Sequence, residues 1–128
     1  MNLLLDSHAF LWFVANDPRL SIAAKAAIEA PTNRKWVSVA SLWELTIKVS
    51  IGKLSLADPV APFLVRELAS NKFSTLDITI DHLAALSNLP FHHRDPFDRM
   101  IVSQAIADSI SIVSTDVALD AYGVSRIW

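Results

Sequence analysis

The chain has 128 residues, a size that suits one domain over residues 1–128 and buries roughly two thirds of the surface that its unfolded form would expose. Hydrophobic residues make up 52% of it and the mean hydropathy is +0.37, so we expect a partner, most simply a second copy, to cover part of the apolar surface. The net charge of −2 excludes a general attraction to nucleic acid. Contacts with nucleic acid would need local basic residues, for which the candidates are Lys48, Lys53, Arg94 and Arg99.

Several protein classes are excluded by what the sequence lacks. No apolar run approaches the roughly 18 uncharged residues that span a bilayer. Asp6 and His8 interrupt the first apolar segment, which also lacks the basic region of a secretory signal, so a cytoplasmic location is expected. The absence of cysteine removes thiol nucleophiles, disulfides and cysteine-based metal sites. With Gly52 and Gly123 as the only glycines, no phosphate-binding loop or serine-hydrolase elbow is present, and no H-E-x-x-H motif occurs either.

The first half of the chain predicts strands alternating with helices. Leu3–Leu5 is a short apolar run cut off by Asp6, as in a buried central strand, and Ser7 is placed to cap the next helix, over 8–14. Five further elements follow from proline, glycine and capping signals. They are a turn at Asp17-Pro18, a helix over 22–30, a strand over 35–39, a helix over 40–51 closed by Gly52, and a helix opened by Asp58-Pro59 through Leu68.

The second half continues the same alternation. Its expected elements are a strand over 74–78, a short helix over 81–86, a helix from Asp95-Pro96 to Asp108, and strands over 111–114 and 124–128. Strands separated by helices of about 10 residues predict an α/β three-layer fold. Its central parallel sheet would have four to five strands with helices on both faces.

Four acids occupy equivalent places in this pattern. Asp6 and Asp116 fall just past strand ends, while Glu44 and Asp98 lie in the first turns of helices. In open parallel sheets, ligands bind beyond the carboxyl ends of the strands, where the following helices also begin. Topology alone can therefore bring these acids to one edge.

Each acid also has a structural alternative. Asp98 projects from the middle of an apolar helical arc, which favours a functional role over a helix-dipole role behind an Asp95 cap. Glu44 is equally explained by an ion pair with Lys48. The apolar arc consists of Phe97, Ile101, Val102, Ala105 and Ile106. Asp116 could cap the turn that follows it, a role compatible with function; Asp17, Asp58, Asp81 and Asp95 are better explained as turns and caps.

The four histidines add little to this set. His92-His93, beside Arg94, could contact a phosphate or support Asp95, but a loop role is favoured. His8 and His82 are expected at packing or surface positions.

If the four acids meet, their charges need compensation. Two like charges about 4 Å apart cost on the order of 4 kcal/mol at an effective dielectric constant of 20, so such a cluster must bind protons or cations. Oxygen ligands select hard ions, Mg²⁺ or Mn²⁺. One or two such ions would orient water and neutralise charge on a phosphate, which points to phosphodiester hydrolysis.

Four ordered blocks resemble the PIN-domain toxins of VapC type. The blocks are Leu4-Leu5-Asp6-Ser7-His8-Ala9-Phe10-Leu11-Trp12, Ser38-Val39-Ala40-Ser41-Leu42-Trp43-Glu44, His93-Arg94-Asp95-Pro96-Phe97-Asp98-Arg99-Met100-Ile101, and Ser114-Thr115-Asp116 with Ala121-Tyr122-Gly123-Val124. The match runs over nearly the whole chain in order and spacing.

The resemblance implies a PIN-like fold and a metal-dependent ribonuclease, the toxin of a type II toxin–antitoxin pair. It also implies a homodimer and a VapB-like antitoxin as partner. The family's acidic metal-binding set falls on Asp6, Glu44, Asp98 and Asp116, the last ligating directly or through water. Ser7 follows the first acid and is expected to orient it.

Two other functions remain open at this stage. A phosphoacceptor receiver domain has a similar architecture and an acidic Mg²⁺ pocket, but it expects paired acids after the first strand and a late lysine. This chain has Asp6 alone and no lysine after Lys72. A non-catalytic module that binds RNA or protein is the second alternative.

Overall fold

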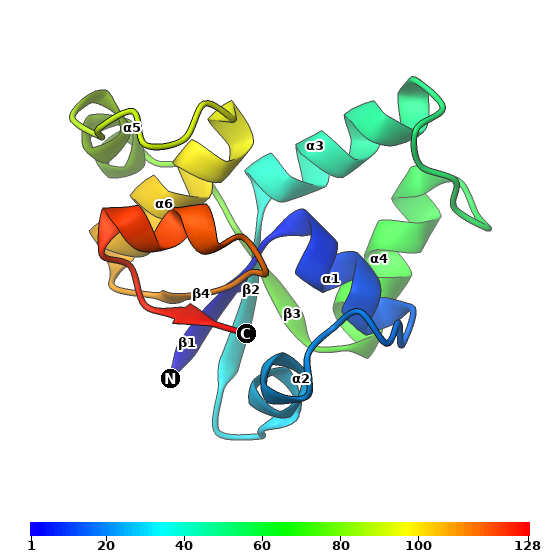
Figure 1. The fold of residues 1–128 in the computed structure, drawn as a ribbon. Helices are drawn as coiled ribbons and strands as arrows, with labels where there is room; N and C mark the ends of the chain where they lie inside the picture. The colour runs from blue at the N-terminus through cyan, green and yellow to red at the C-terminus, as the bar shows by residue number, and fades with distance from the viewer.

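The structure, a computed structural model that describes residues 1–128, is organised around one parallel five-stranded sheet of order β3-β2-β1-β4-β5 (Figure 1). Its strands are β1 (Asn2–Leu5), β2 (Arg34–Ser38), β3 (Phe73–Leu76), β4 (Ser111–Val113) and β5 (Arg126–Ile127). Its helices are α1 (Ser7–Val14), α2 (Ile22–Glu29), α3 (Val39–Ser50), α4 (Val60–Ser70), α5 (Ile80–Ser87), α6 (Pro96–Asp108) and the 3-10 helix η1 (Val117–Tyr122). The predicted parallel sheet and α/β class are confirmed.

The two faces of the central strand β1 fill two separate cores. Leu3 and Leu5 point into a core closed by α1, α2 and α4, where Phe10 is fully buried. Leu4 points to the opposite face, against α6 and η1, where it packs near Ile101. A strand buried on both faces is apolar at every position rather than at alternate ones. The run Leu3–Leu5 is therefore explained by a three-layer arrangement.

The start of α1 differs from its prediction. Asp6, rather than Ser7, is the N-cap: its Oδ1 accepts a hydrogen bond of 2.8 Å from the Ala9 backbone N–H. Ser7 is the first residue of the helix, and its hydroxyl is used elsewhere. A carboxylate at the cap position also interacts favourably with the positive end of the helix dipole.

Two of the other acids expected to be caps have different roles. Pro59, without any side-chain hydrogen bond, precedes α4, and Asp58 forms an ion pair with Arg66 instead. Thr79 caps α5, and Asp81 lies in the first turn of that helix. Asp95 is the cap of α6, as predicted, because its Oδ1 accepts from the N–H groups of residues 97 and 98.

Most element boundaries lie within one to three residues of their predicted places. Gly52 has φ +77° and follows Ile51, the C-cap of α3, which confirms the left-handed residue predicted at the end of that helix. None of the helices combines the length and the apolar character that crossing a bilayer requires. The sheet order also differs from the 2-1-3-4-5 order of receiver-like domains, because β3 lies outside β2 rather than beside β1.

Candidate functional site

The candidate site lies at the edge where β1, β2 and β4 end. Leu5 of β1 pairs with Val37 of β2 on one side and Val113 of β4 on the other, so the three carboxyl ends are level. The helices α1 and α3 begin directly beyond this edge, and α3 contacts both α1 and α6 (Figure 1). Asp6, Glu44, Asp98 and Asp116 are predicted to converge at this edge. That prediction depends on where the strands end and the helices begin.

Asp6 is the most enclosed carboxylate of the four. Its side chain is buried behind β1, and burial is the main reason why its pKa is raised above the ordinary value. Hydrogen bonds from the Ser114 side chain and the Ala9 N–H act in the opposite direction and favour the charged form. The neighbouring Glu44 carboxylate adds a smaller upward contribution to the Asp6 pKa, which places the two acids in one electrostatic cluster.

Glu44 is buried and oriented from two directions. Ser7 Oγ donates a hydrogen bond of 2.7 Å to Glu44 Oε1, and Lys48 Nζ lies 3.8 Å from Glu44 Oε2. The ion pair between Glu44 and Lys48, which was the structural alternative to a functional role, is therefore present. The Glu44 carboxylate nevertheless faces Ser7 and not bulk solvent. Ser7 was expected to orient Asp6; it orients Glu44 instead, because Asp6 is already held as the α1 cap.

Asp98 has the most strongly shifted pKa of the acids. Burial is the largest cause and the Asp95 charge the second, and together with Glu44 and Asp6 they raise the pKa of Asp98 to about 7. His93 partly offsets this rise. Since Asp6 and Glu44 both raise the pKa of Asp98, these three carboxylates, carried by α1, α3 and α6, interact electrostatically with one another.

Asp116 combines a capping role with a place in the cluster. Its Oδ1 accepts a hydrogen bond of 3.0 Å from the Ala118 N–H at the start of η1, as expected for a cap. Its Oδ2 lies 2.9 Å from His93 Nε2, which is also 3.4 Å from Asp98 Oδ2. One ligand atom from each of these three residues lies within 4.8 Å of the other two.

His93 is the site residue that the sequence reasoning missed. A loop role was favoured for it, and its ring instead lies between two of the predicted acids. The loop before α6 is fixed by Arg99, which is buried and donates to the carbonyl oxygens of Leu89 and Pro90. Arg99 is therefore not an exposed contact for nucleic acid, whereas Arg94 in the same segment is exposed.

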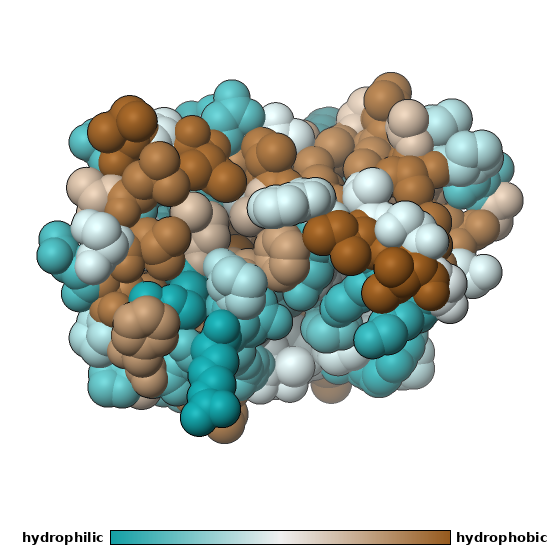
Figure 2. All heavy atoms as spheres, turned by 90° about the horizontal axis from the view of Figure 1, so that it is seen from above, coloured by the Kyte–Doolittle hydropathy of each residue, from teal (hydrophilic) through white to brown (hydrophobic).

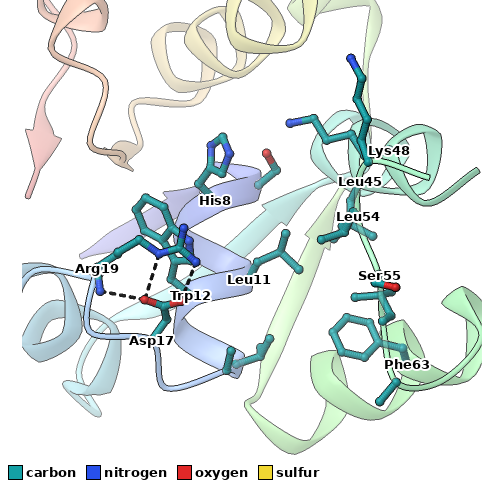
Figure 3. A pocket seen from close by; sticks show the side chains of 16 residues that line it. His8, Leu11, Trp12, Asp17, Arg19, Leu45, Lys48, Leu54, Ser55 and Phe63 are labelled. Atoms are coloured by element: carbon teal, nitrogen blue, oxygen red, sulfur yellow. Dashed lines mark hydrogen bonds and ion pairs between the residues drawn. The ribbon is translucent and has the colours of Figure 1, made fainter. Parts of the chain in front are cut away.

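A cleft of about 500 Å³ opens beside Ser7, between α1 and the segment that joins α3 to α4. In Figure 3, Leu11 and Trp12 of α1 face Leu54 and Phe63 across it, with Lys48 at one end. Arg19 and Asp17 close the opposite end through hydrogen bonds of 2.7 to 3.1 Å. The cleft is mainly apolar and adjoins the acidic cluster.

The donor set of the cluster suits a hard divalent cation. Two cationic side chains lie near the acids. Lys48 Nζ is 3.8 Å from Glu44 Oε2, and the charge of Asp116 contributes to raising the pKa of Arg126. These two side chains do not neutralise four carboxylates, so a deficit of positive charge remains at the centre. Carboxylate oxygens with such a deficit are the ligands that Mg²⁺ and Mn²⁺ prefer.

Comparison with known proteins decides the family. The PIN domain model matches residues 3–124. The chain is also 35% identical over 129 residues to ribonuclease VapC22 of Mycobacterium tuberculosis, an alignment covering 98% of this chain and 97% of that protein. The chain is a PIN-domain protein of the VapC family. The resemblance of the four sequence blocks is thereby confirmed.

Solved structures share the fold of this VapC-family chain. VapBC2 from Rickettsia felis bound to a promoter DNA fragment superposes with a TM-score of 0.76 at 17% identity, covering 98% of this chain and 97% of that one. VapBC-1 from nontypeable Haemophilus influenzae gives 0.66 at 15% identity, with 98% and 96% covered. FitAcB from Neisseria gonorrhoeae gives 0.65 at 16% identity, with 97% and 95% covered.

We predict that Asp98→Asn stabilises the metal-free protein in a pH-dependent way. An acid with a raised pKa binds a proton in the folded state that the unfolded chain has already released, so its contribution to stability is lost as pH rises through about 7. The variant lacks that charge. Its melting temperature in excess chelator should exceed that of the wild type by roughly 3 to 6 °C at pH 8. The gain should be clearly smaller at pH 5, because the loss of stability accumulates between the ordinary pKa of 3.8 and the raised pKa of about 7.

Differential scanning calorimetry at the two pH values measures this difference. Asp81→Asn, which removes an exposed charge in α5, is the control and should show no pH-dependent gain. An equal gain for Asp98→Asn at both pH values would contradict the electrostatic explanation.

Proposed function

We propose that this protein is a divalent-metal-dependent endoribonuclease, the toxin of a type II toxin–antitoxin pair. The observation that supports this most is the convergence of carboxylates at the carboxyl edge of a PIN-family sheet, where the pKa of Asp98 is raised to about 7. The relative VapC22 bears the name ribonuclease. RNA is accordingly the substrate class that we propose.

The proposed ligands are Asp6, Glu44, Asp98 and Asp116, with Asp116 acting directly or through water. One or two Mg²⁺ or Mn²⁺ ions held there would stabilise the negative charge that develops on a phosphate during hydrolysis. The protein prepares the carboxylates for this role: Ser7 fixes one oxygen of Glu44, and the Ala9 N–H fixes one oxygen of Asp6. The free energy of folding compensates for the repulsion between the carboxylates, so the site is preorganised before a metal ion binds.

The proposed partner is a VapB-like antitoxin, and the cleft beside α1 is the place that we propose for it. Two of the solved structures that share the fold are those of VapBC2 and VapBC-1. Leu11, Leu54 and Phe63 give the cleft an apolar lining suited to side chains of a docked segment. Because the cleft adjoins Ser7 and Lys48, a segment bound there would also lie next to the acidic cluster.

We further propose that the body of the toxin is a homodimer. Apolar side chains gather along one side of the face drawn in Figure 2. Helix α5 exposes Ile80 (79%) and Leu83 (46%), and α3 exposes Trp43 (61%). Exposed apolar side chains on two helices that both contact α6 mark an interaction surface, and a second copy accounts for the high hydropathy of the chain.

Removing one proposed ligand should abolish cleavage without unfolding the protein. We expect Asp6→Asn and Asp98→Asn each to reduce the rate at least 100-fold, because a neutral amide binds Mg²⁺ less well than a carboxylate. Asparagine is as good an N-cap as aspartate, so α1 survives the change at Asp6. Digestion of tRNA and rRNA fragments, with and without Mg²⁺ or Mn²⁺, followed by gel electrophoresis measures the effect.

Asp81→Asn is the matched control for that experiment and should cleave like the wild type. Circular dichroism verifies that each variant is folded. Full activity in Asp6→Asn or Asp98→Asn, or undiminished cleavage in excess chelator, would refute the proposed mechanism.

Antitoxin binding should depend on the cleft. Leu54→Asp places a charge among apolar side chains, and we expect it to weaken binding of the antitoxin encoded in a neighbouring reading frame at least 10-fold. Ile22→Asp, at an exposed position outside the cleft, is the control. Calorimetric titration measures both affinities, and equal values would exclude the cleft as the docking site.

The dimer should depend on the exposed face of α5. We expect the double variant Ile80→Glu and Leu83→Glu to elute as a single chain where the wild type elutes as a pair, because like charges would then meet across the interface. Light scattering coupled to gel filtration gives the masses. Val65→Glu, on the exposed face of α4, should leave the mass unchanged.

A further inference from the structure

The imidazole of His93 has both of its nitrogens engaged. Nε2 lies 2.9 Å from Asp116 Oδ2 and 3.4 Å from Asp98 Oδ2. On the other side of the ring, Nδ1 accepts a hydrogen bond of 3.1 Å from the Asp95 backbone N–H. The ring thus connects two acids of the cluster to the N-cap of α6.

These contacts determine which nitrogen carries the proton. Because Nδ1 accepts an N–H, its lone pair must be free, so the neutral ring carries its hydrogen on Nε2. That single N–H donates to Asp116 and lies within reach of Asp98 on the same side. The arrangement makes His93 a donor toward the carboxylates.

The ring is also held in place through the backbone. The His93 N–H donates to Tyr122 Oη over 2.8 Å, and Arg99 approaches the same oxygen at 3.4 Å. Arg99 in turn holds the carbonyl oxygens of Leu89 and Pro90. Turning the ring away would therefore disrupt contacts on both sides of this loop.

We propose that His93 is a positioning residue of the metal site: its shared N–H aligns one oxygen of Asp98 and one of Asp116, and it does not ligate the ion itself. This inference rests on the proposed function, because it concerns how that function's carboxylates are oriented. It distinguishes two roles that the clustering of His93, Asp98 and Asp116 alone leaves open.

Coordination by Nε2 conflicts with the hydrogen bonds of the loop. To bind an ion, Nε2 would have to give up its proton, and a neutral ring would then carry it on Nδ1. The Asp95 N–H already points at Nδ1, so two donors would face each other and the Asp95 amide would lose its acceptor. Since Asp95 caps α6, this would disturb the start of the helix that carries Asp98.

The assignment has a consequence for the choice of metal. With His93 outside the ligand set, the site presents oxygen ligands only, which favours Mg²⁺ and Mn²⁺. Were the imidazole a ligand, Zn²⁺ and other borderline ions would gain instead. A hydrogen-bond partner of metal-binding carboxylates typically changes metal affinity 10- to 100-fold.

Calorimetric titration with Mn²⁺ alone, without RNA, tests the proposal. We expect His93→Ala to bind Mn²⁺ about 10-fold more weakly than the wild type. We expect His93→Gln to bind within about threefold of it, because the glutamine amide can place an N–H where Nε2 stands. His92→Ala, an exposed neighbour without a hydrogen bond to the acids, should bind like the wild type.

Long-range ¹H–¹⁵N NMR of the histidine-labelled wild type at pH 8 supplies a second measurement. The His93 Nε2 should stay protonated before and after addition of Mg²⁺. Loss of that proton in Mg²⁺, or wild-type Mn²⁺ affinity in His93→Ala, would overturn the positioning role. The NMR result needs no variant, so it decides the question even where His93→Ala fails to fold.

Asp98→Asn separates the two proposals. If the wild type binds Mn²⁺ and Asp98→Asn does not, the metal site stands, and the His93 results judge the positioning role alone. If the wild type does not bind Mn²⁺ at all, the proposed function fails and the inference fails with it.

Discussion

Parallel pairing of β1 with β2 and β4 is the constraint on which the site depends. The register sets Leu5 level with Val37 and Val113, so the chain leaves the sheet at the same height three times. Each exit leads into a helix or turn that carries an acid. A shift of one residue in β1 would turn Leu3 and Leu5 from one core to the other and move Asp6 to the opposite face. Core packing and site geometry are thus fixed by the same hydrogen bonds.

The cluster of like charges is made tolerable by local backbone donors. Asp6 and Asp116 each accept a hydrogen bond from a helix-starting N–H, and Asp95 accepts two. Helix N-termini carry partial positive charge, so they favour ionised carboxylates at this edge. Asp98 has no such donor of its own, and it is the acid whose pKa rises to about 7. Backbone donors therefore support Asp6, Asp95 and Asp116, and the Ser7 hydroxyl supports Glu44, whereas Asp98 depends on its neighbours.

The sequence predicted the strands, the α/β class and the meeting of the acids because these depend on periodicity and topology. It could not predict which oxygen meets which donor. Ser7 was expected to orient Asp6, but the path of α3 brings Glu44 to its hydroxyl. Ile106 was placed on the buried arc of α6, but its side chain is exposed, whereas Ile101, Val102 and Ala105 of the same arc are buried. The caps of α1 and α5 differ from their predictions because a cap depends on which neighbouring side chain forms the local hydrogen bond.

His93 shows the same limit at the site itself. The local sequence His-Arg-Asp-Pro does not predict whether the His93 ring turns inward. The orientation depends on Tyr122, which is nearly 30 residues away and whose hydroxyl accepts the His93 N–H. The Arg99 side chain works in the same way: its charge suggested a contact with nucleic acid, yet it is buried, where it holds the loop through two carbonyl oxygens. Asp95 caps the helix, Arg99 fixes the loop and His93 joins both to the acids. The segment is therefore one hydrogen-bonded unit, in which residues that look like separate functional candidates position Asp98 together.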